Sequence, residues 1–206
     1  MELTAAIRGR RMVRSFAAAP VDPEVVDGLC DLARRAPSAG NTQALDLVVL
    51  EGAEQVARYW DVTLPAPRRA AFQWPGLVAA PVLIVVAVRP GAYVDRYAEA
   101  DKEPTGLGAG TAAWAVPYWW VDAGAAIEHL LLGAVDAGLG ACLFGLFDHE
   151  AAVAEAIGVP DVPDGRRLVA TIALGHPVAA GDPSPPGRSA RRPRRTLDEV
   201  VHRSTW

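Results

Sequence analysis

The first feature that could carry chemistry is a cluster of arginines near the N-terminus. Arg8, Arg10, Arg11 and Arg14 fall within seven residues, ahead of a chain that is otherwise apolar and slightly acidic. Guanidinium groups at this density suit a multiply charged anion, because each presents paired donors to phosphate oxygens. A second basic cluster lies near the C-terminus and contains Arg188, Arg191, Arg192, Arg194 and Arg195. The alternative is that both clusters are solvated basic patches.

A polar segment, Pro37–Gln43, follows the first arginine cluster and has the sequence PSAGNTQ. Its Ser38 and Asn41 side chains offer polar contacts to a ligand. The alternative is the end of a helix with turn chemistry, which by itself explains the proline, the glycine and the asparagine.

A third candidate is the segment 93–120, in which aromatic residues alternate with glycines. Tyrosines and tryptophans among glycines suggest a mobile cover over a planar site. The alternative is that the aromatic rings pack the core in front of a long helix. The residues concerned are Tyr93, Tyr97, Trp114, Tyr118, Trp119 and Trp120, with Gly106, Gly108 and Gly110 between them.

Other kinds of site find little support in the sequence. His149-Glu150 begins like a zinc-binding HExxH motif, but Val153 occupies the position of the second ligand. The three glycines at 106–110 do not follow an expected strand, and there is no G-x-S-x-G nucleophile motif. His129 lies on an apolar helix and is interpreted as a satisfied interface residue rather than a catalytic base.

The elements that position these residues follow from periodicity and capping signals. Residues 3–11 predict a helix that carries the first arginine cluster at its C-terminal end. Asp22 and Pro23 are typical of the start of a second helix, which Pro37 ends. Strands are expected at 45–50, 81–88 and 168–174, and further helices at 53–60, 122–138 and 148–158. Thr196 and Glu199 have the spacing of a capping box that opens a final short helix.

Two of these elements indicate how much of the chain is buried. The run at 81–88 is β-branched without alternation, which predicts a strand buried on both faces. The helix at 122–138 is apolar around most of its circumference, and two chains that met along it would bury it. Helices and strands are mixed without regular alternation, so the expected fold class is α+β.

Length and composition exclude several classes of protein. The 206 residues suit one domain, 1–206, in which the proline-rich region from 178 to 206 is an extended arm. No apolar run could span a bilayer and no signal core is present, so we expect a cytoplasmic protein with no membrane partner. Cys30 and Cys142 lie in apolar segments and predict buried thiols. From Pro186 onward the net charge is +4, but this tail has no interleaved aromatic residues, so nucleic acid is not expected as a partner.

The order and spacing of these motifs resemble the FMN-dependent nitroreductase family. That family has an arginine-rich start, then A-P-S-x-x-N-x-Q before a strand, and later a helix that ends A-x-G-L-G. It then has a G-x-P segment and a basic stretch that leads into L-x-E-V-V. The corresponding later segments here are Asp136–Gly140, Gly175–Pro177 and Arg194–Val201. The resemblance covers nearly the whole chain and is weakest between residues 52 and 120.

The resemblance implies a fold and an assembly. The family has a central mixed β-sheet flanked by helices. Two chains form an intertwined homodimer through a long central helix, with exchange of the C-terminal arms.

The resemblance also assigns residues to FMN. It places Arg10, Arg11 and the tail arginines Arg192, Arg194 or Arg195 at the flavin phosphate, and Arg14 at the pyrimidine edge. Pro37, Ser38, Ala39, Asn41 and Gln43 would contact the flavin of the other subunit. Leu143, Phe144, Gly145 and Leu146 would form a loop that lies against the central ring.

Two positions depart from the family's pattern. Met12 stands where the family usually has serine, so only a backbone contact to phosphate could remain. Ala44-Leu45 follows Gln43 where the family often has Pro-Trp, which leaves the packing behind the ring open.

The implied activity is ping-pong hydride transfer from NADH or NADPH through FMN to a small organic acceptor such as a nitroaromatic, a quinone or an unsaturated metabolite. No side chain is assigned as an obligatory acid or base. One alternative is the superfamily branch that fragments reduced FMN to dimethylbenzimidazole, and another is a dehydrogenase of a peptide-derived metabolite. A flavin-binding sensor or storage protein without turnover is a third.

Overall fold

A four-stranded sheet forms the centre of the molecule in a computed structural model that describes residues 1–160, 165–178 and 192–206. The strands are β1 (Leu45–Glu51), β2 (Val82–Val88), β3 (Gly140–Phe144) and β4 (Arg167–Gly175). Their spatial order is β1-β2-β4-β3, and every neighbouring pair is antiparallel. Arg188, Arg191 and the part of the expected arm at 179–191 lie outside the described residues.

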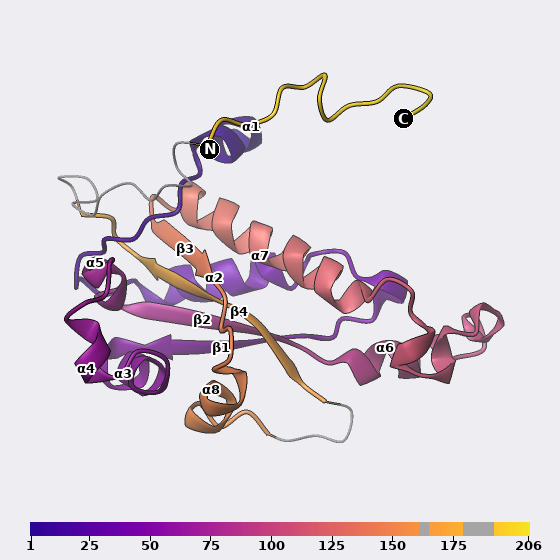
Figure 1. Cartoon of the computed structure of the whole chain (residues 1–206), viewed down its shortest axis with the longest axis horizontal. Coiled ribbons are helices and arrows are strands. Elements are labelled where there is room, and N and C mark those ends of the chain that lie inside the picture. Colours follow the sequence, from indigo (N-terminus) through magenta and orange to yellow (C-terminus); the bar gives the residue numbers. More distant parts are fainter. Residues whose placement is uncertain (161–164, 179–191) are drawn as a thin grey trace.

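Helices cover both faces of this sheet (Figure 1). The longer ones are α2 (Pro23–Ala33), α3 (Gly52–Thr63), α6 (Pro90–Tyr97) and α7 (Tyr118–Asp136). The shorter ones are α1 (Leu3–Gly9), α4 (Ala66–Arg69), α5 (Pro75–Val78) and α8 (Glu150–Ala156). Helices and strands are mixed in the order that the α+β expectation requires, so the fold class is confirmed.

Side-chain alternation along β2 explains the two layers of helices. Val82, Ile84 and Val86 pack with α2 and α7, whereas Leu83 and Val85 pack with α3 and α8 on the opposite face. All seven residues of β2 are buried, as the unalternating sequence predicts. A strand that is apolar on both faces needs a helical layer on each side.

A parallel component is present beside β3. Met12 forms an isolated parallel bridge with Ala141, and the backbone N–H of Val13 donates to the carbonyl of Ala141 at 2.9 Å. The segment Arg10–Phe16 therefore runs along the free edge of β3. Among the described residues, the pairs of named strands are all antiparallel, and this bridge adds a parallel pairing to the sheet.

Several expected boundaries are confirmed or shifted slightly. The strands expected at 45–50, 81–88 and 168–174 are β1, β2 and β4. Asp22 caps α2 as predicted, because its carboxylate accepts from the backbone N–H of Glu24 at 2.9 Å. Helix α1 ends at Gly9 rather than at residue 11, which leaves Arg10 and Arg11 in extended chain. Helix α7 begins at Tyr118, four residues before the expected start.

Two expectations are wrong. Residues 140–144 form the strand β3, so Leu143 and Phe144 belong to the sheet and only the residues after them are loop. The final helix expected from Thr196 is a turn, in which the Glu199 carboxylate accepts from the backbone N–H of Thr196 at 2.7 Å. That contact is half of a capping box. The residues that follow are exposed, so nothing among residues 1–160, 165–178 and 192–206 packs against them to support a helix.

The segment 93–120 was expected either to cover a planar site or to pack the core, and its aromatic residues differ in burial. Tyr93, Trp114 and Trp119 are buried in one cluster with edge-to-face ring contacts, which confirms core packing for these three. Tyr118 remains exposed. His129 donates through Nδ1 to the Leu32 carbonyl at 3.0 Å, so this side chain has a hydrogen-bond partner within the chain, as expected.

The thiols and the surface complete the comparison. Cys142 is buried in β3, and Cys30 is half-buried in α2. No helix in the described ranges combines the length and apolarity that a bilayer crossing requires.

Candidate functional site

Arg14 and the end of β3 meet at a cavity of about 280 Å³. Arg14 lines it together with Leu143, Phe144, Gly145 and Leu146. Pairing of the segment Arg10–Phe16 with β3 causes this meeting. The structure therefore brings together two sets of residues that the sequence predicted separately.

Aromatic rings form much of the wall of this cavity, and α3 and the residues before α5 supply most of them. Trp60 stacks on Phe144 with ring centroids 5.7 Å apart, and Tyr59 meets Phe144 edge-on. Phe72 and Trp74 line the same cavity. Planar apolar walls of this kind suit a planar ligand.

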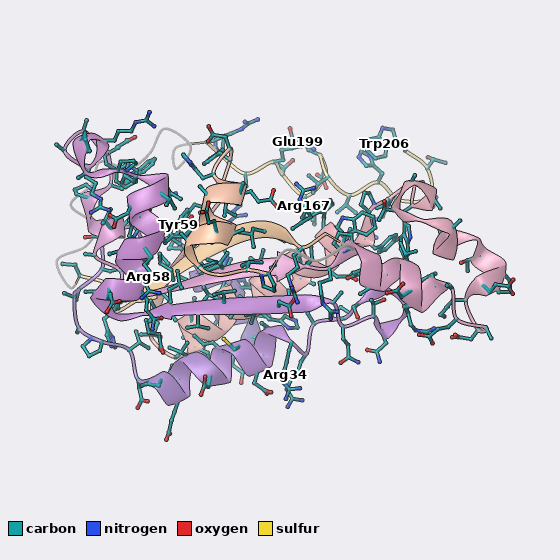
Figure 2. All side chains as sticks on the ribbon, turned by 90° about the horizontal axis from the view of Figure 1, so that it is seen from below. Arg34, Arg58, Tyr59, Arg167, Glu199 and Trp206 are labelled. Atoms are coloured by element: carbon teal, nitrogen blue, oxygen red, sulfur yellow. The ribbon has the colours of Figure 1, made fainter. Side chains whose placement is uncertain are left out.

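Tyr59 is held in place from behind by the sheet. The hydroxyl of Thr171 in β4 donates to the Tyr59 oxygen at 3.0 Å, and both residues are buried. Figure 2 shows Tyr59 between α3 and the sheet. Burial raises the pKa of Tyr59 to about 12, so this phenol stays neutral at physiological pH and does not act as a base.

Arg14 brings a positive charge to the apolar cavity. Its guanidinium carbon lies 5.3 Å from the centre of the Trp74 ring, and its Nη1 donates to the Met12 carbonyl at 3.3 Å. Met12 in turn contacts the other wall, because the backbone N–H of Leu143 points to its sulfur at 3.4 Å. Met12, Arg14 and Leu143 are thus in direct or near contact.

The remaining arginines lie apart from this cavity. Arg10 forms an ion pair with Glu128 of α7 at 3.5 Å, and Arg11 donates to the carbonyls of Arg8 and Arg10. Both follow α1 on the extended segment that leads to Arg14. The tail residues Arg192, Arg194 and Arg195 are exposed, and Arg195 donates to the Glu199 carbonyl.

The segment Pro37–Gln43 adopts a backbone that few sequences tolerate. Gly40, Asn41 and Gln43 have φ values of 63°, 55° and 54°, in the left-handed region. The last two are not glycines, and such conformations cost about 1–3 kcal/mol each when the surroundings do not favour them. Their occurrence within four residues indicates that neighbouring groups hold this loop.

Two side chains outside the loop hold it, and a third supports one of these two. Asp122 of α7 accepts from the backbone N–H of Ala39 and from the hydroxyl of Tyr93, both at 2.8 Å. Arg96 of α6 donates through Nε to the Gly40 carbonyl at 2.9 Å. Burial and the Asp122 carboxylate raise the pKa of Tyr93 well above its ordinary value, so Tyr93 remains a donor.

Contacts within the loop complete the arrangement. The Ser38 hydroxyl accepts from the backbone N–H of Gln43 at 3.1 Å, and the Gln43 amide donates to Asn41 at 3.2 Å. Pro37, Ser38 and Gln43 border a small cavity of about 30 Å³. None of the residues lining this cavity lines the cavity of Arg14. One chain therefore presents two separate groups of the predicted residues.

Sequence reasoning missed the side chains that support these groups. Trp60, Phe72 and Trp74 belong to the region where the motifs are weakest, and only their shared cavity identifies them. Asp122 and Arg96 are ordinary surface-type residues in the sequence, and their hydrogen bonds to the loop identify them. His149 lines the cavity of Arg14, beside Asp148 at 3.4 Å. Within the described ranges, no group of three His, Cys, Asp or Glu side chains could hold a metal ion.

Comparison of the sequence with known proteins identifies a family and a named relative. The sequence model of the nitroreductase family matches residues 7–176. A 4-nitrobenzoate reductase from Nocardioides sp. (strain LMS-CY) is 31% identical over 208 aligned positions, which cover 85% of this chain and 83% of the relative.

Solved structures show the same fold at lower identity. A nitroreductase family protein from Streptococcus pneumoniae TIGR4 superposes with a TM-score of 0.72 at 21% identity, over 98% of this chain and 99% of the other. A protein from Desulfovibrio desulfuricans, solved in complex with FMN, has a TM-score of 0.67 at 22% identity over 100% and 98% of the two chains.

The backbone of the loop leads to a first prediction, for Gly40→Ala. A Cβ atom on Gly40 would lie 2.8 Å from Cε2 of Tyr97, at a φ of 63° that alanine adopts poorly. We expect the free energy of unfolding to fall by about 1–3 kcal/mol in urea denaturation. The matched control is Gly28→Ala in α2, which has no heavy atom within 4 Å. It should raise the free energy of unfolding by about 0.5–1 kcal/mol, and equal effects of the two changes would contradict the prediction.

Proposed function

The chain belongs to the nitroreductase family, and on that premise we propose that it is an FMN-dependent oxidoreductase that works as a homodimer. The single observation that best supports FMN is the cavity in which Arg14 and Leu143–Leu146 meet among aromatic side chains. The protein solved with FMN has the same fold.

The side chains in and near this cavity match the chemical parts of FMN. The isoalloxazine ring is planar and largely apolar, and the walls formed by Trp60, Phe144 and Trp74 match that character. The phosphate carries about two negative charges, and Arg10 and Arg11 offer donors on the segment that leads to the cavity. Arg192, Arg194 or Arg195 of a partner chain would complete the phosphate site.

Arg14 has a defined electrostatic task in this proposal. When bound, FMN would supply the redox chemistry, taking hydride from NADH or NADPH and delivering electrons to an acceptor. A fixed positive charge at the pyrimidine edge would stabilise the negative charge of the reduced cofactor. Arg14 forms no ion pair with the described carboxylates, so none of them neutralises its charge.

The walls of the cavity would position the reactants and exclude water. Reductant and acceptor would enter the same opening in turn, which gives a ping-pong cycle. Tyr59 cannot exchange protons near neutral pH because its pKa is about 12, and no other side chain is assigned as an obligatory acid or base. The named relative acts on 4-nitrobenzoate, which supports a small nitroaromatic as acceptor, with quinones and unsaturated metabolites as further candidates.

The surface of the chain supports a homodimer. Apolar side chains remain exposed on three neighbouring helices, including Ile7 of α1, Leu32 of α2 and Val121 of α7. The C-terminal tail runs away from the body (Figure 1). It carries exposed Leu197, Val200 and Val201, and Figure 2 shows Glu199 and Trp206 along it. A second chain that received this tail would bury these residues and could bring the loop Pro37–Gln43 to the partner's flavin.

Turnover is the experiment that tests the proposed activity. The FMN-loaded protein should be bleached anaerobically by NADH or NADPH and should oxidise the preferred nucleotide continuously when 4-nitrobenzoate or a quinone is supplied. A protein that binds FMN but shows no turnover would favour the sensor or storage alternative. Formation of dimethylbenzimidazole from reduced FMN under oxygen would favour the flavin-fragmenting alternative.

The phosphate assignment leads to a separate prediction for Arg10→Ala and Arg194→Ala. Each change removes a charge-assisted contact of about 1.5–3 kcal/mol, so affinity for FMN should fall roughly tenfold to a hundredfold. Riboflavin lacks the phosphate, and its affinity should barely change. The control is Arg58→Ala, because Arg58 projects from α3 and pairs with Glu54 (Figure 2). Equal loss of FMN and riboflavin binding would indicate a structural effect instead.

The assembly proposal predicts the behaviour of Ile7→Glu. Ile7 is 52% exposed in the isolated chain, and burial of a new carboxylate in a subunit interface is unfavourable. Sedimentation should show a dimer for the unchanged protein and a shift toward monomer for Ile7→Glu. Ala152→Glu, on the exposed side of α8, is the matched control and should remain dimeric. A stable, flavin-loaded monomer of the unchanged protein at micromolar concentration would refute the proposal.

A further inference from the structure

Arg14 is held by an aromatic side chain rather than by a carboxylate. Its guanidinium lies over the Trp74 ring at 5.3 Å, and its Nη1 donates to the Met12 carbonyl at 3.3 Å. In the described part of the chain it forms no ion pair. A carboxylate would also hold Arg14 in place, but it would cancel the charge that faces the cavity.

Trp74 is itself fixed by the packing around it. Its ring meets Phe72 edge-on at 5.9 Å, and it immediately precedes the helix α5. The backbone N–H of Phe16 donates to the Gly76 carbonyl at 3.2 Å. This contact joins the segment that carries Arg14 to the segment that carries Trp74.

Gly76 allows these two segments to approach closely. A Cβ atom at this position would lie 2.7 Å from the Ser15 hydroxyl oxygen and 2.8 Å from the Ser15 Cα. Such distances leave no room for a side chain between them. Arg14 and Trp74 therefore lie on two backbones in direct contact, one residue before Ser15 and two residues before Gly76.

We propose that Trp74 is a positioning residue that holds the Arg14 guanidinium beside the pyrimidine edge of the flavin without neutralising it. The ring face attracts the cation through its quadrupole and limits the rotamers of a long side chain. The N–H groups at the edge of the guanidinium remain able to donate to a ligand. This inference rests on the proposed function, because it needs flavin in the cavity of Arg14.

Sulfite provides a probe that needs no turnover. It adds to the flavin N5 atom and leaves a negative charge on the pyrimidine ring, and the loss of flavin absorbance reports its affinity. Trp74→Leu should weaken sulfite binding to the FMN-loaded protein about threefold to tenfold, a range that matches the usual strength of a cation–π contact. Trp74→Phe keeps an aromatic face and should retain most of the affinity.

A double-mutant cycle separates positioning from a general structural effect. If Trp74 acts through Arg14, Trp74→Leu should have no further effect on sulfite affinity once Arg14→Gln is present. An equal effect of Trp74→Leu in both backgrounds would overturn the proposal. The same cycle on the unfolding equilibrium of the flavin-free protein should show a coupling of about threefold between the two side chains.

Failure of the Trp74 proposal can be distinguished from failure of folding and from failure of the proposed function. If Trp74→Leu does not fold, Trp74→Met replaces it, because methionine is apolar and flexible but has no aromatic face. If the unchanged protein binds no FMN, the proposed function itself fails. If it binds FMN and sulfite but shows no coupling between residues 14 and 74, only the role of Trp74 fails.

Discussion

The burial of β2 on both faces is the constraint on which the rest of this structure depends. A strand with no polar side at all must be covered twice, so α2 and α7 form one layer and α3 and α8 the other. The second layer supplies Tyr59 and Trp60, which become walls of the candidate site. The architecture and the cavity are therefore consequences of one apolar strand.

Pairing at the edge of the sheet sets the position of the Arg14 guanidinium. The segment Arg10–Phe16 pairs with β3 through Met12 and Val13, and this pairing brings Arg14 to the end of the strand. An isolated positive charge in an apolar cavity is unfavourable unless something compensates it. The face of Trp74 does so in part, and an anionic ligand would do so more completely. The site is thus electrostatically prepared for negative charge.

The division of the predicted residues into two groups has a physical meaning. The loop Pro37–Gln43 is strained and is held by Asp122 and Arg96, yet its residues do not line the cavity of Arg14. Strain that is maintained by several partners commonly marks a functional segment. A second chain offers a reason for it, because one subunit could present the loop to the cavity of the other. Exposed apolar side chains such as Ile7 and Val121 agree with that arrangement.

The sequence by itself determined the family, the fold class and three of the strands, because these depend on local patterns of apolar residues and on the order of short motifs. It also indicated Arg14 and Leu143–Leu146 as ligand contacts. Only the tertiary structure showed that they share a cavity, that Leu143 and Phe144 belong to a strand, and that Trp74, Asp122 and Arg96 support them. These contacts join residues far apart in the chain. No periodicity or spacing encodes them, because they arise from the packing of several elements at once.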